Sequence, residues 1–343
     1  MVTIASADRS VLRKQVEVLA VAEGFLKSAV LFALVKLGVF GRLGDGTATA
    51  HALARDLEAH PAALTRLLDA GVALHILEAA EGGAYGIASP FREVLAPSAG
   101  DHSLLSWLEN LDFLRDAVSR LDQAARTGQP TVDPSQLLKT DPKAVRDFTL
   151  AMHDYASVRG RELARFLDTS GCRTLLDLGA GPGTYAFHLG ARNPNLELFL
   201  LDLPEVLKVA RDVATRYALA NSIHYLPQDA IHDAIPGSYD LVLVSNTLHM
   251  LGERQSRLLL DRLYAALNPG GSLVVQAQFL DADRQGPRWP AMLDLFQLCI
   301  TPEGRNHTME ETTVWLEAAG FTAIETCHMS LVNTNSYLRA HRS

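Results

Sequence analysis

The sequence is poor in cysteine and carries no excess of positive charge. Its three cysteines, Cys172, Cys299 and Cys327, are scattered and form no CxxC pair, which predicts free thiols in a reducing compartment. The formal net charge of −8 argues against broad nucleic-acid binding, because such binding needs a basic surface. The histidines show no HxH or HxxxH spacing, so we expect no metal site.

Long uncharged runs are missing as well. The most apolar early stretch, residues 16–40, is interrupted by Glu23, Lys27 and Lys36, so we expect neither a spanning segment nor a signal peptide, and predict a cytoplasmic protein without membrane contact. Over residues 10–38 apolar positions recur at helical spacing, in places nearly all round the helix. Such a helix must be covered, which predicts a homodimer through the N-terminal region.

The 343 residues are enough for two domains of ordinary size. Near the N-terminus, Thr49 can cap a short helix, Pro61 can begin a second, and "AYGIAS" resembles a strand of a small wing. Helix, helix and two-stranded wing form a winged-helix pattern, for which DNA binding is one alternative. Residues 1–100 hold nine Lys and Arg against ten Asp and Glu, and the second helix offers only Arg66 to a phosphate, which disfavours that alternative.

The second half of the chain has a different pattern of apolar and polar residues. Asp141 and Pro142 mark the start of one long helix, and from residue 173 short apolar runs alternate with amphipathic stretches. This alternation predicts a mostly parallel sheet with helices on both faces. We divide the chain into a winged-helix-like dimerisation domain (1–100), a helical linker that contributes to the substrate pocket (101–165), and a Rossmann-like domain (166–343).

The stretch "LLDLGAGPGTYAF" predicts a ligand loop between a strand and a helix. Glycine at positions 179, 181 and 183 allows positive φ and close backbone approach. The spacing is GxGxG, with Thr184 in the place of the third glycine of a dinucleotide loop. Asp177, two residues before the first glycine, would repel a pyrophosphate and suits a ligand with an ammonium group.

Two further acids follow the next two strands. Asp202 lies at the distance at which a carboxylate takes both ribose hydroxyls, and Asp229 can accept a hydrogen bond from an adenine amino group, with Ala230 leaving room for the ring. Three acids at successive strand ends suit a cationic adenosyl ligand without phosphate. S-adenosylmethionine, with S-adenosylhomocysteine as its product, fits that description.

With these motifs the chain resembles the class I S-adenosylmethionine-dependent O-methyltransferases of the two-domain caffeate, hydroxyneurosporene and antibiotic-pathway type. The resemblance covers essentially the whole chain, through "DLGAGPG", "LLDLP", "QDA", "DLVLVSNTLHML", "LNPGGSLVV" and "GRNHTMEETTVWLEAAGF". It implies a seven-stranded Rossmann-like domain with an N-terminal all-helical winged-helix-like dimerisation domain. The implied cofactor residues are Asp177, Gly179, Gly181, Gly183, Asp202, Leu203, Asp229, Ala230 and Ser245.

His249 falls at the family's catalytic histidine. An imidazole beyond the fourth strand can take the proton of an attacking hydroxyl, which contributes about 10²–10⁴-fold. The chain departs from the family where supporting acids are expected, with Ala277 and Asn306 in their places and Met250 after the histidine. Without such an acid His249 is a weaker base, which suits an already acidic hydroxyl and leaves C- or N-methylation, or a non-transferring relative, as alternatives.

In the family, acceptors lie between late helices of the sheet domain and the helices before it. Met292 and Phe296 are four residues apart and share a helix face, where they form adaptable walls for a flat ring. The acceptor predicted is an aromatic or polyketide-like small molecule of secondary metabolism. The candidate pocket residues are Trp107, Phe113, Phe148, Met152, His153, Tyr155, Met292, Phe296 and Asn306.

Overall fold

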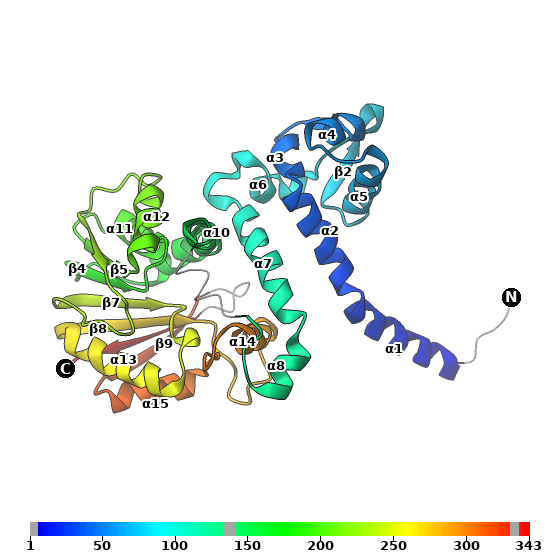
Figure 1. The fold of residues 1–343 in the computed structure, drawn as a ribbon. Helices are drawn as coiled ribbons and strands as arrows, with labels where there is room; N and C mark the ends of the chain where they lie inside the picture. Colours follow the sequence, from blue (N-terminus) through cyan, green and yellow to red (C-terminus); the bar gives the residue numbers. More distant parts are fainter. Residues whose placement is uncertain (1–5, 133–140, 330–335) are drawn as a thin grey trace. The chain divides into compact units, whose positions relative to one another are not determined.

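The computed structural model describes residues 6–132, 141–329 and 336–343. The chain forms two compact units, Met1–Glu109 and Asn110–Ser343, and the division falls inside helix α7 (Leu105–Val118) (Figure 1). Each unit has a hydrophobic core of its own. The finer division into 1–100, 101–165 and 166–343 stays a prediction.

The N-terminal unit combines helices with a small sheet. Its main elements are α1 (Ser6–Ala22), α2 (Gly24–Lys36), α3 (Val39–Leu43), β1 (Thr47–Thr49), α4 (Ala50–Asp56), α5 (Pro61–Ala73), β2 (Leu77–Ala80), β3 (Ala84–Ile87) and α6 (Arg92–Leu95). Thr49 caps α4 by accepting a hydrogen bond from the Ala52 N–H, and Pro61 occupies the first turn of α5. The strands pair in the order β1-β3-β2, so the wing has a third strand beyond the two predicted.

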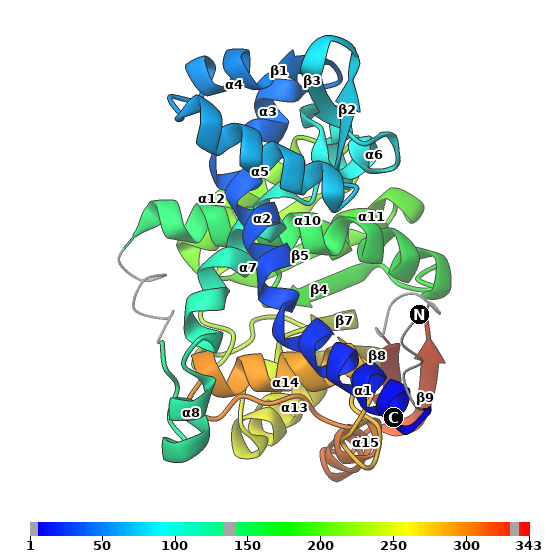
Figure 2. The same cartoon turned by 90° about the vertical axis from the view of Figure 1, so that its right-hand side faces the viewer.

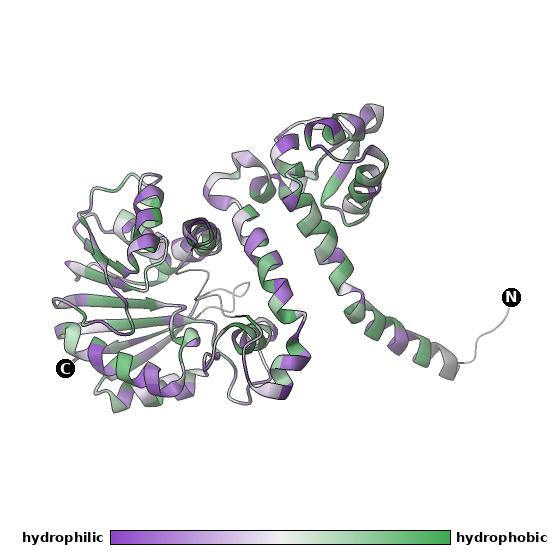
Figure 3. Ribbon diagram, viewed as in Figure 1, coloured by the Kyte–Doolittle hydropathy of each residue, from purple (hydrophilic) through white to green (hydrophobic). Residues whose placement is uncertain are grey.

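Helices α1 and α2 carry the apolar stretch identified in the sequence. Figure 3 shows both helices rich in hydrophobic residues. Ser10–Lys36 is long and apolar enough to cross a membrane, the one helical run with this property among the residues described, although the charged residues led us to expect none. Length and composition alone are weak support for a span, because buried helices and signal sequences share them. The side chains of Val21 and Phe25 are 83% and 67% exposed, so this unit by itself leaves a large apolar face uncovered.

The C-terminal unit is built on one large sheet. Its strands are β4 (Thr174–Leu178), β5 (Glu197–Asp202), β6 (Ile223–Pro227), β7 (Tyr239–Ser245), β8 (Leu267–Ala277), β9 (Thr322–His328) and β10 (Ser336–His341). Its helices are α8 (Leu121–Thr127), α10 (Pro142–Phe166), α11 (Thr184–Arg192), α12 (Pro204–Ala214), α13 (Glu253–Ala266), α14 (Arg288–Ile300) and α15 (Met309–Ala318). Asp141 caps α10 through the Lys143 N–H, as the sequence predicts.

The sheet order is β6-β5-β4-β7-β8-β10-β9, with β10 antiparallel to both neighbours and the other pairs parallel. The predicted mostly parallel sheet of seven strands is confirmed. Alternate residues of each strand point to opposite faces, so Leu175 packs with α10, α11 and α12, whereas Leu176 packs with α13 and α15. Figure 2 shows these two sets of helices on opposite sides of the sheet. The strand order reverses beside β4, which places the ligand crevice at the carboxyl ends of β4, β5 and β7.

Candidate active site

The glycine loop after β4 adopts a backbone that only glycine tolerates well. Gly179, Gly181 and Gly183 have φ of 67°, 54° and 76°. A Cβ at Gly183 would lie 2.4 Å from Leu200 Cδ2, so this glycine permits close packing of loop and sheet. A Cβ at Gly181 would meet no heavy atom of the described residues within 4 Å. The loop therefore has an open backbone position at Gly181 where a ligand can approach.

Asp202, at the end of β5, holds this loop. Its Oδ2 accepts a hydrogen bond from the Gly181 N–H at 2.7 Å, and its Oδ1 accepts one from the Leu203 N–H at 2.7 Å. Burial raises the pKa of Asp202 even though both hydrogen bonds act in the opposite direction. The carboxylate thus sits between the loop and the next helix, with acceptor capacity left for hydroxyl donors.

Asp177 is a buried acid with one side-chain oxygen that lacks a hydrogen-bond partner among the described residues. Its side chain is 1% exposed, and Oδ2 is buried without a hydrogen-bond partner among the described residues. Burial, and then the nearby carboxylate of Asp202, raise the pKa of Asp177 to about 8. A buried carboxylate of this kind becomes stable when a cation binds beside it.

Asp229 is arranged differently from the other two acids. Its Oδ1 accepts hydrogen bonds from the Ile231 and His232 N–H groups, and its Oδ2 lies 2.9 Å from His232 Nδ1. Burial acts to raise its pKa, but the His232 and backbone hydrogen bonds outweigh burial, so the pKa of Asp229 is lowered. Ala230 packs partly buried against the core beside it. Asp229 is therefore an ionised acceptor in a turn beyond β6.

Together these groups fit a ribose-bearing ligand with a positively charged end. The Asp177 oxygen that lacks a hydrogen-bond partner would be stabilised by a cation, and the open position at Gly181 allows a ligand to approach the backbone. The row of acids would repel a pyrophosphate. The residues present therefore suit S-adenosylmethionine and do not suit a dinucleotide.

His249 lies in a short 3-10 turn, Leu248–Met250, just beyond β7. Its Nδ1 is buried and has no hydrogen-bond partner among the described residues. Burial, and then the neighbouring His307, lower the pKa of His249 to about 4. The imidazole is therefore neutral at physiological pH, so it can accept a proton, but it is a weak base.

The turn that carries His249 is held by His307. The buried His307 ring lies with Nε2 3.2 Å from the Leu248 carbonyl oxygen, and it packs edge-on against Trp315 with ring centroids 4.7 Å apart. The sequence suggested no role for His307 in placing His249, because 58 residues separate the two.

At the two positions where the family places supporting acids, the structure shows other contacts. Asn306 is buried; its N–H donates to Asp294 Oδ1 at 2.6 Å and its side-chain amide donates to the Pro290 carbonyl at 2.8 Å. Ala277 packs against the core at the end of β8. Among the residues described, no carboxylate forms an ion pair with His249. That His249 acts as a base without a supporting acid stays a prediction.

A polar network beyond β7 and β8 was not anticipated from the sequence. The Ser245 hydroxyl donates to Gln276 Oε1 at 2.9 Å, and the Gln276 amide donates to the Tyr185 hydroxyl at 3.4 Å. The Gln278 amide donates to the Tyr155 hydroxyl. The network joins residues up to 123 positions apart, so only the topology of the sheet brings them together.

The acceptor candidates are distributed over several helices. His153 is buried in α10 and lies 2.8 Å from the Thr184 hydroxyl, whereas Tyr155 reaches the end of β8. Trp107 belongs to the N-terminal unit and stays a sequence-based prediction. The half-exposed or exposed side chains are Phe113, Phe148, Met152, Met292 and Phe296.

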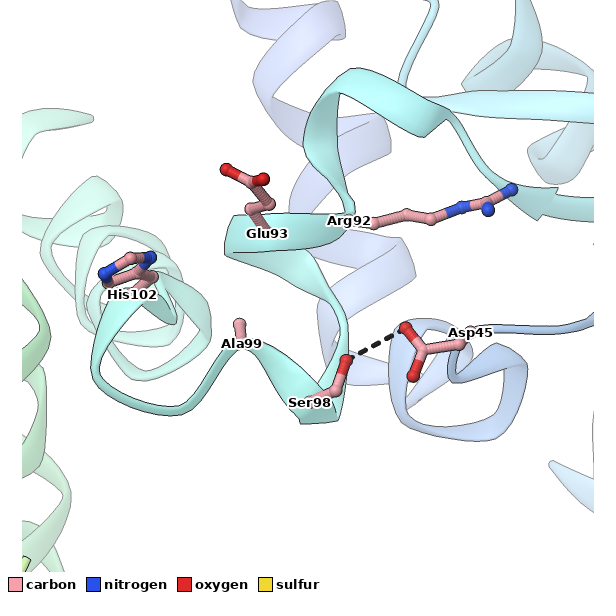
Figure 4. A pocket seen from close by; sticks show the side chains of 6 residues that line it. All are labelled: Asp45, Arg92, Glu93, Ser98, Ala99 and His102. Atoms are coloured by element: carbon pink, nitrogen blue, oxygen red, sulfur yellow. Dashed lines mark hydrogen bonds between the residues drawn. The ribbon is translucent and has the colours of Figure 1, made fainter.

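A separate hollow of about 350 Å³ lies within the N-terminal unit (Figure 4). The Ser98 hydroxyl donates to Asp45 at 2.9 Å across it, and Arg92 is engaged with Glu78 at 2.6 Å. Arg92 and Asp45, two of its lining residues, are thus held by hydrogen bonds, and we assign the hollow no catalytic role. Over the described parts of the chain, no group of three or more His, Cys, Asp or Glu side chains is placed to hold a metal ion.

Comparison with known proteins bears on the family and the fold of the chain. The sequence model of the O-methyltransferase domain matches residues 114–322, and that of the O-methyltransferase dimerisation domain matches residues 19–89. The chain is 30% identical over 323 residues to the tetracenomycin polyketide synthesis 8-O-methyl transferase TcmO of Streptomyces glaucescens, covering 92% of this chain and 93% of that protein.

Two further relatives extend the comparison. The chain is 28% identical over 317 residues to the 3-hydroxy-5-methyl-1-naphthoate 3-O-methyltransferase of Streptomyces sahachiroi, covering 92% of this chain and 91% of the relative. Its fold is similar to that of human N-acetylserotonin methyltransferase in complex with SAM, with a TM-score of 0.87 at 25% identity over 100% of this chain and 99% of that chain.

Proposed function

The chain belongs to the S-adenosylmethionine-dependent O-methyltransferases, and from this premise we propose that it methylates a hydroxyl of an aromatic or polyketide-like small molecule with His249 as general base. Two relatives are named for action on a naphthoate and in polyketide synthesis, which supports a flat, ring-containing acceptor. The observation that carries the assignment of the base is the neutral imidazole of His249 beyond β7, with a buried ring nitrogen left unpartnered.

We propose a place for each part of the donor on this chain. Gly179, Gly181 and Gly183 pass its methionine end, and the orphaned oxygen of Asp177 lies near enough to this loop to meet the ammonium group. Asp202, with Leu203 beside it, holds the ribose hydroxyls. Asp229 and Ala230 flank the adenine, and Ser245 lines the crevice at the end of β7.

The bound donor supplies an activated methyl group on its sulfonium, so the protein needs to align the acceptor and take one proton. His249 takes that proton from the acceptor hydroxyl as the oxygen reacts. Because the pKa of His249 is lowered to about 4, transfer from an ordinary phenol is uphill. The acceptor hydroxyl we propose is therefore an acidic one, such as a phenol conjugated to a carbonyl.

We propose that the acceptor ring lies against α10 and α14. Met292 is 46% exposed in α14 and Phe296 follows one turn later, so the helix presents an apolar face that can hold a flat ring. Phe148, Met152 and Tyr155 present side chains from α10. The remaining candidates are Trp107, Phe113, His153 and Asn306.

We further propose that two copies of the chain associate through α1 and α2, and that the enzyme is cytoplasmic. Part of this apolar region lies within the matched dimerisation domain, residues 19–89. Exposed apolar side chains on these helices need a cover, and a second copy supplies one.

The substitution His249→Ala tests the base. We expect kcat to fall by about 10²–10⁴-fold while calorimetric affinity for S-adenosylhomocysteine stays within about 2-fold of wild type. Met250→Ala, in the same turn and 43% exposed, is the matched control and keeps near-normal turnover. Unchanged turnover in His249→Ala would remove this residue from the mechanism. Mass analysis showing transferred label on carbon or nitrogen would refute transfer to a hydroxyl.

A further inference from the structure

Arg159, in α10, is a guanidinium without a matching anion. Its Nε is buried and has no hydrogen-bond partner among the described residues. Its Nη1 donates to the Tyr155 carbonyl at 2.7 Å, and its Cζ lies 3.6 Å from the centre of the Tyr155 ring. No described carboxylate lies within salt-bridge distance of it. A ring face, one carbonyl and the Tyr155 hydroxyl carry no formal charge to balance this partly buried cation, so the site favours an anionic ligand.

The position of Arg159 places this cation beside the ligand crevice. The next residue, Gly160, packs closely against α11: a Cβ there would lie 2.6 Å from His188 Cδ2, and 3.5 Å from the carbonyl oxygen of Thr184, which directly follows the glycine loop. The Tyr155 hydroxyl, one turn earlier in α10, bonds to Gln278 beyond β8. The segment of α10 that contains Arg159 therefore lies between the start of α11 and the end of β8.

The hydroxyl of Tyr185 is influenced by the charges of both Arg159 and Asp177. Tyr185 lies in the first turn of α11, and its pKa is raised, chiefly by burial. The charge of Arg159 acts to lower this pKa, whereas the charge of Asp177 acts to raise it. Both charges therefore act on the same hydroxyl, yet the two side chains form no ion pair. A guanidinium and an acid that both act on one hydroxyl without pairing with each other suit a ligand that carries a carboxylate and an ammonium group.

We infer that Arg159 is a binding residue that receives a carboxylate of a bound ligand, opposite the ammonium-binding oxygen of Asp177. This inference rests on the proposed function. The carboxylate has two possible sources in that reaction, namely the methionine end of the donor and an acidic group on the acceptor. A planar guanidinium binds a carboxylate from either source through paired N–H donors.

The donor arm of the test is calorimetry with S-adenosylmethionine and its decarboxylated analogue, which keeps the ammonium and the sulfonium. If the donor supplies the carboxylate, wild type binds the intact donor about 10- to 100-fold more tightly than the analogue. Arg159→Gln then binds the two within about 3-fold, and Arg159→Lys keeps part of the preference. Arg165→Gln, at an exposed position of α10, is the control that keeps it in full.

The acceptor arm compares a hydroxynaphthoate with its methyl ester as substrates. If the acceptor supplies the carboxylate, wild type prefers the acid in kcat/KM, Arg159→Gln abolishes this preference, and donor affinity does not change. The inference is overturned if Arg159→Gln alters neither preference while its thermal midpoint stays near that of wild type. A wild type that binds neither donor contradicts the proposed function instead, so the two failures are distinguishable.

Discussion

The two compact units leave opposite kinds of group unsatisfied. In the N-terminal unit, eight large apolar side chains between residues 11 and 26 are exposed on α1 and α2. In the C-terminal unit, polar atoms of Asp177, Arg159 and His249 are buried without partners among the described residues. An exposed apolar face is satisfied by another apolar face, whereas a buried polar atom is satisfied by a small ligand of complementary charge. The first pattern therefore indicates a protein partner and the second a bound small molecule.

The largest expected effect comes from placing charged residues on the apolar face of α1 and α2, which should prevent the two copies from associating. We expect Val21→Glu with Phe25→Glu to raise the dimer dissociation constant by roughly 10³-fold or more, because two carboxylates would have to be buried in the interface. Both side chains are exposed in the single unit, so its fold is preserved. Sedimentation velocity over a range of concentrations measures the change.

Lys27→Glu in α2 is the control for the dimer prediction. It alters the charge by the same amount as the double substitution but replaces a residue that is already charged and exposed. We expect at most a small change in its dissociation constant. A wild type that is monomeric at all concentrations would contradict the interpretation of this face.

Two glycines of the same loop have different expected roles, since Gly183 is needed for packing and Gly181 for ligand binding. Gly183→Ala should lower the free energy of unfolding by about 3 kcal/mol, because the Cβ collides with Leu200 and the left-handed φ is strained. Gly181→Ala, where space is open, should lower it by about 1 kcal/mol but weaken donor binding by about 10-fold. Urea unfolding and calorimetry separate the two effects. Equal losses of stability would contradict the distinction.

Local signals were sufficient for much of the fold. Thr49, Pro61 and Asp141 mark helix starts by their own backbone and hydrogen-bonding properties, so the sequence predicts them directly. Period-two and period-3.6 patterns predict the strands and helices of the C-terminal unit. The three-residue strand β1 carries too short a pattern to be recognised, and it forms because β3 pairs with it.

The site was predictable only where one segment builds it. The glycine loop and the acids at or near the carboxyl ends of β4, β5 and β6 follow from their position along the strands, because parallel strands share an edge. The contact of His307 with the Leu248 carbonyl joins residues far apart in the chain, and no local pattern encodes it. Tertiary packing also decides the pKa of Asp177 and of His249, since burial is the first cause of each shift.

The hydrogen bond from His307 to the Leu248 carbonyl allows a test of how His249 is positioned in the C-terminal unit. His307→Phe should lower kcat by about 10-fold with little change in donor affinity, because the turn carrying His249 loses a bond to the Leu248 carbonyl. His307→Gln retains an N–H donor and should recover most of the rate. Single-turnover kinetics measure both variants. Equal rates in the two would show that the hydrogen bond does not position the base.

The smallest effect concerns pH. A general base must be unprotonated, and the pKa of His249 is lowered to about 4, so the imidazole stays neutral as pH rises above about 5. With a saturating acceptor whose hydroxyl remains un-ionised, kcat should change by less than about 2-fold between pH 5.5 and 7.5. A loss of activity centred near pH 6.5 would instead indicate an ordinary histidine.

The most direct measurement is the number of protons released when S-adenosylhomocysteine binds at pH 7. In the free protein Asp177, with a pKa of about 8, is mostly protonated. An ammonium group beside it favours the ionised form, so binding expels the proton. Calorimetry in buffers of low and high ionisation enthalpy should show release of close to one proton in wild type and none in Asp177→Asn, which binds more weakly. Proton uptake, or equal release in both proteins, would contradict the account.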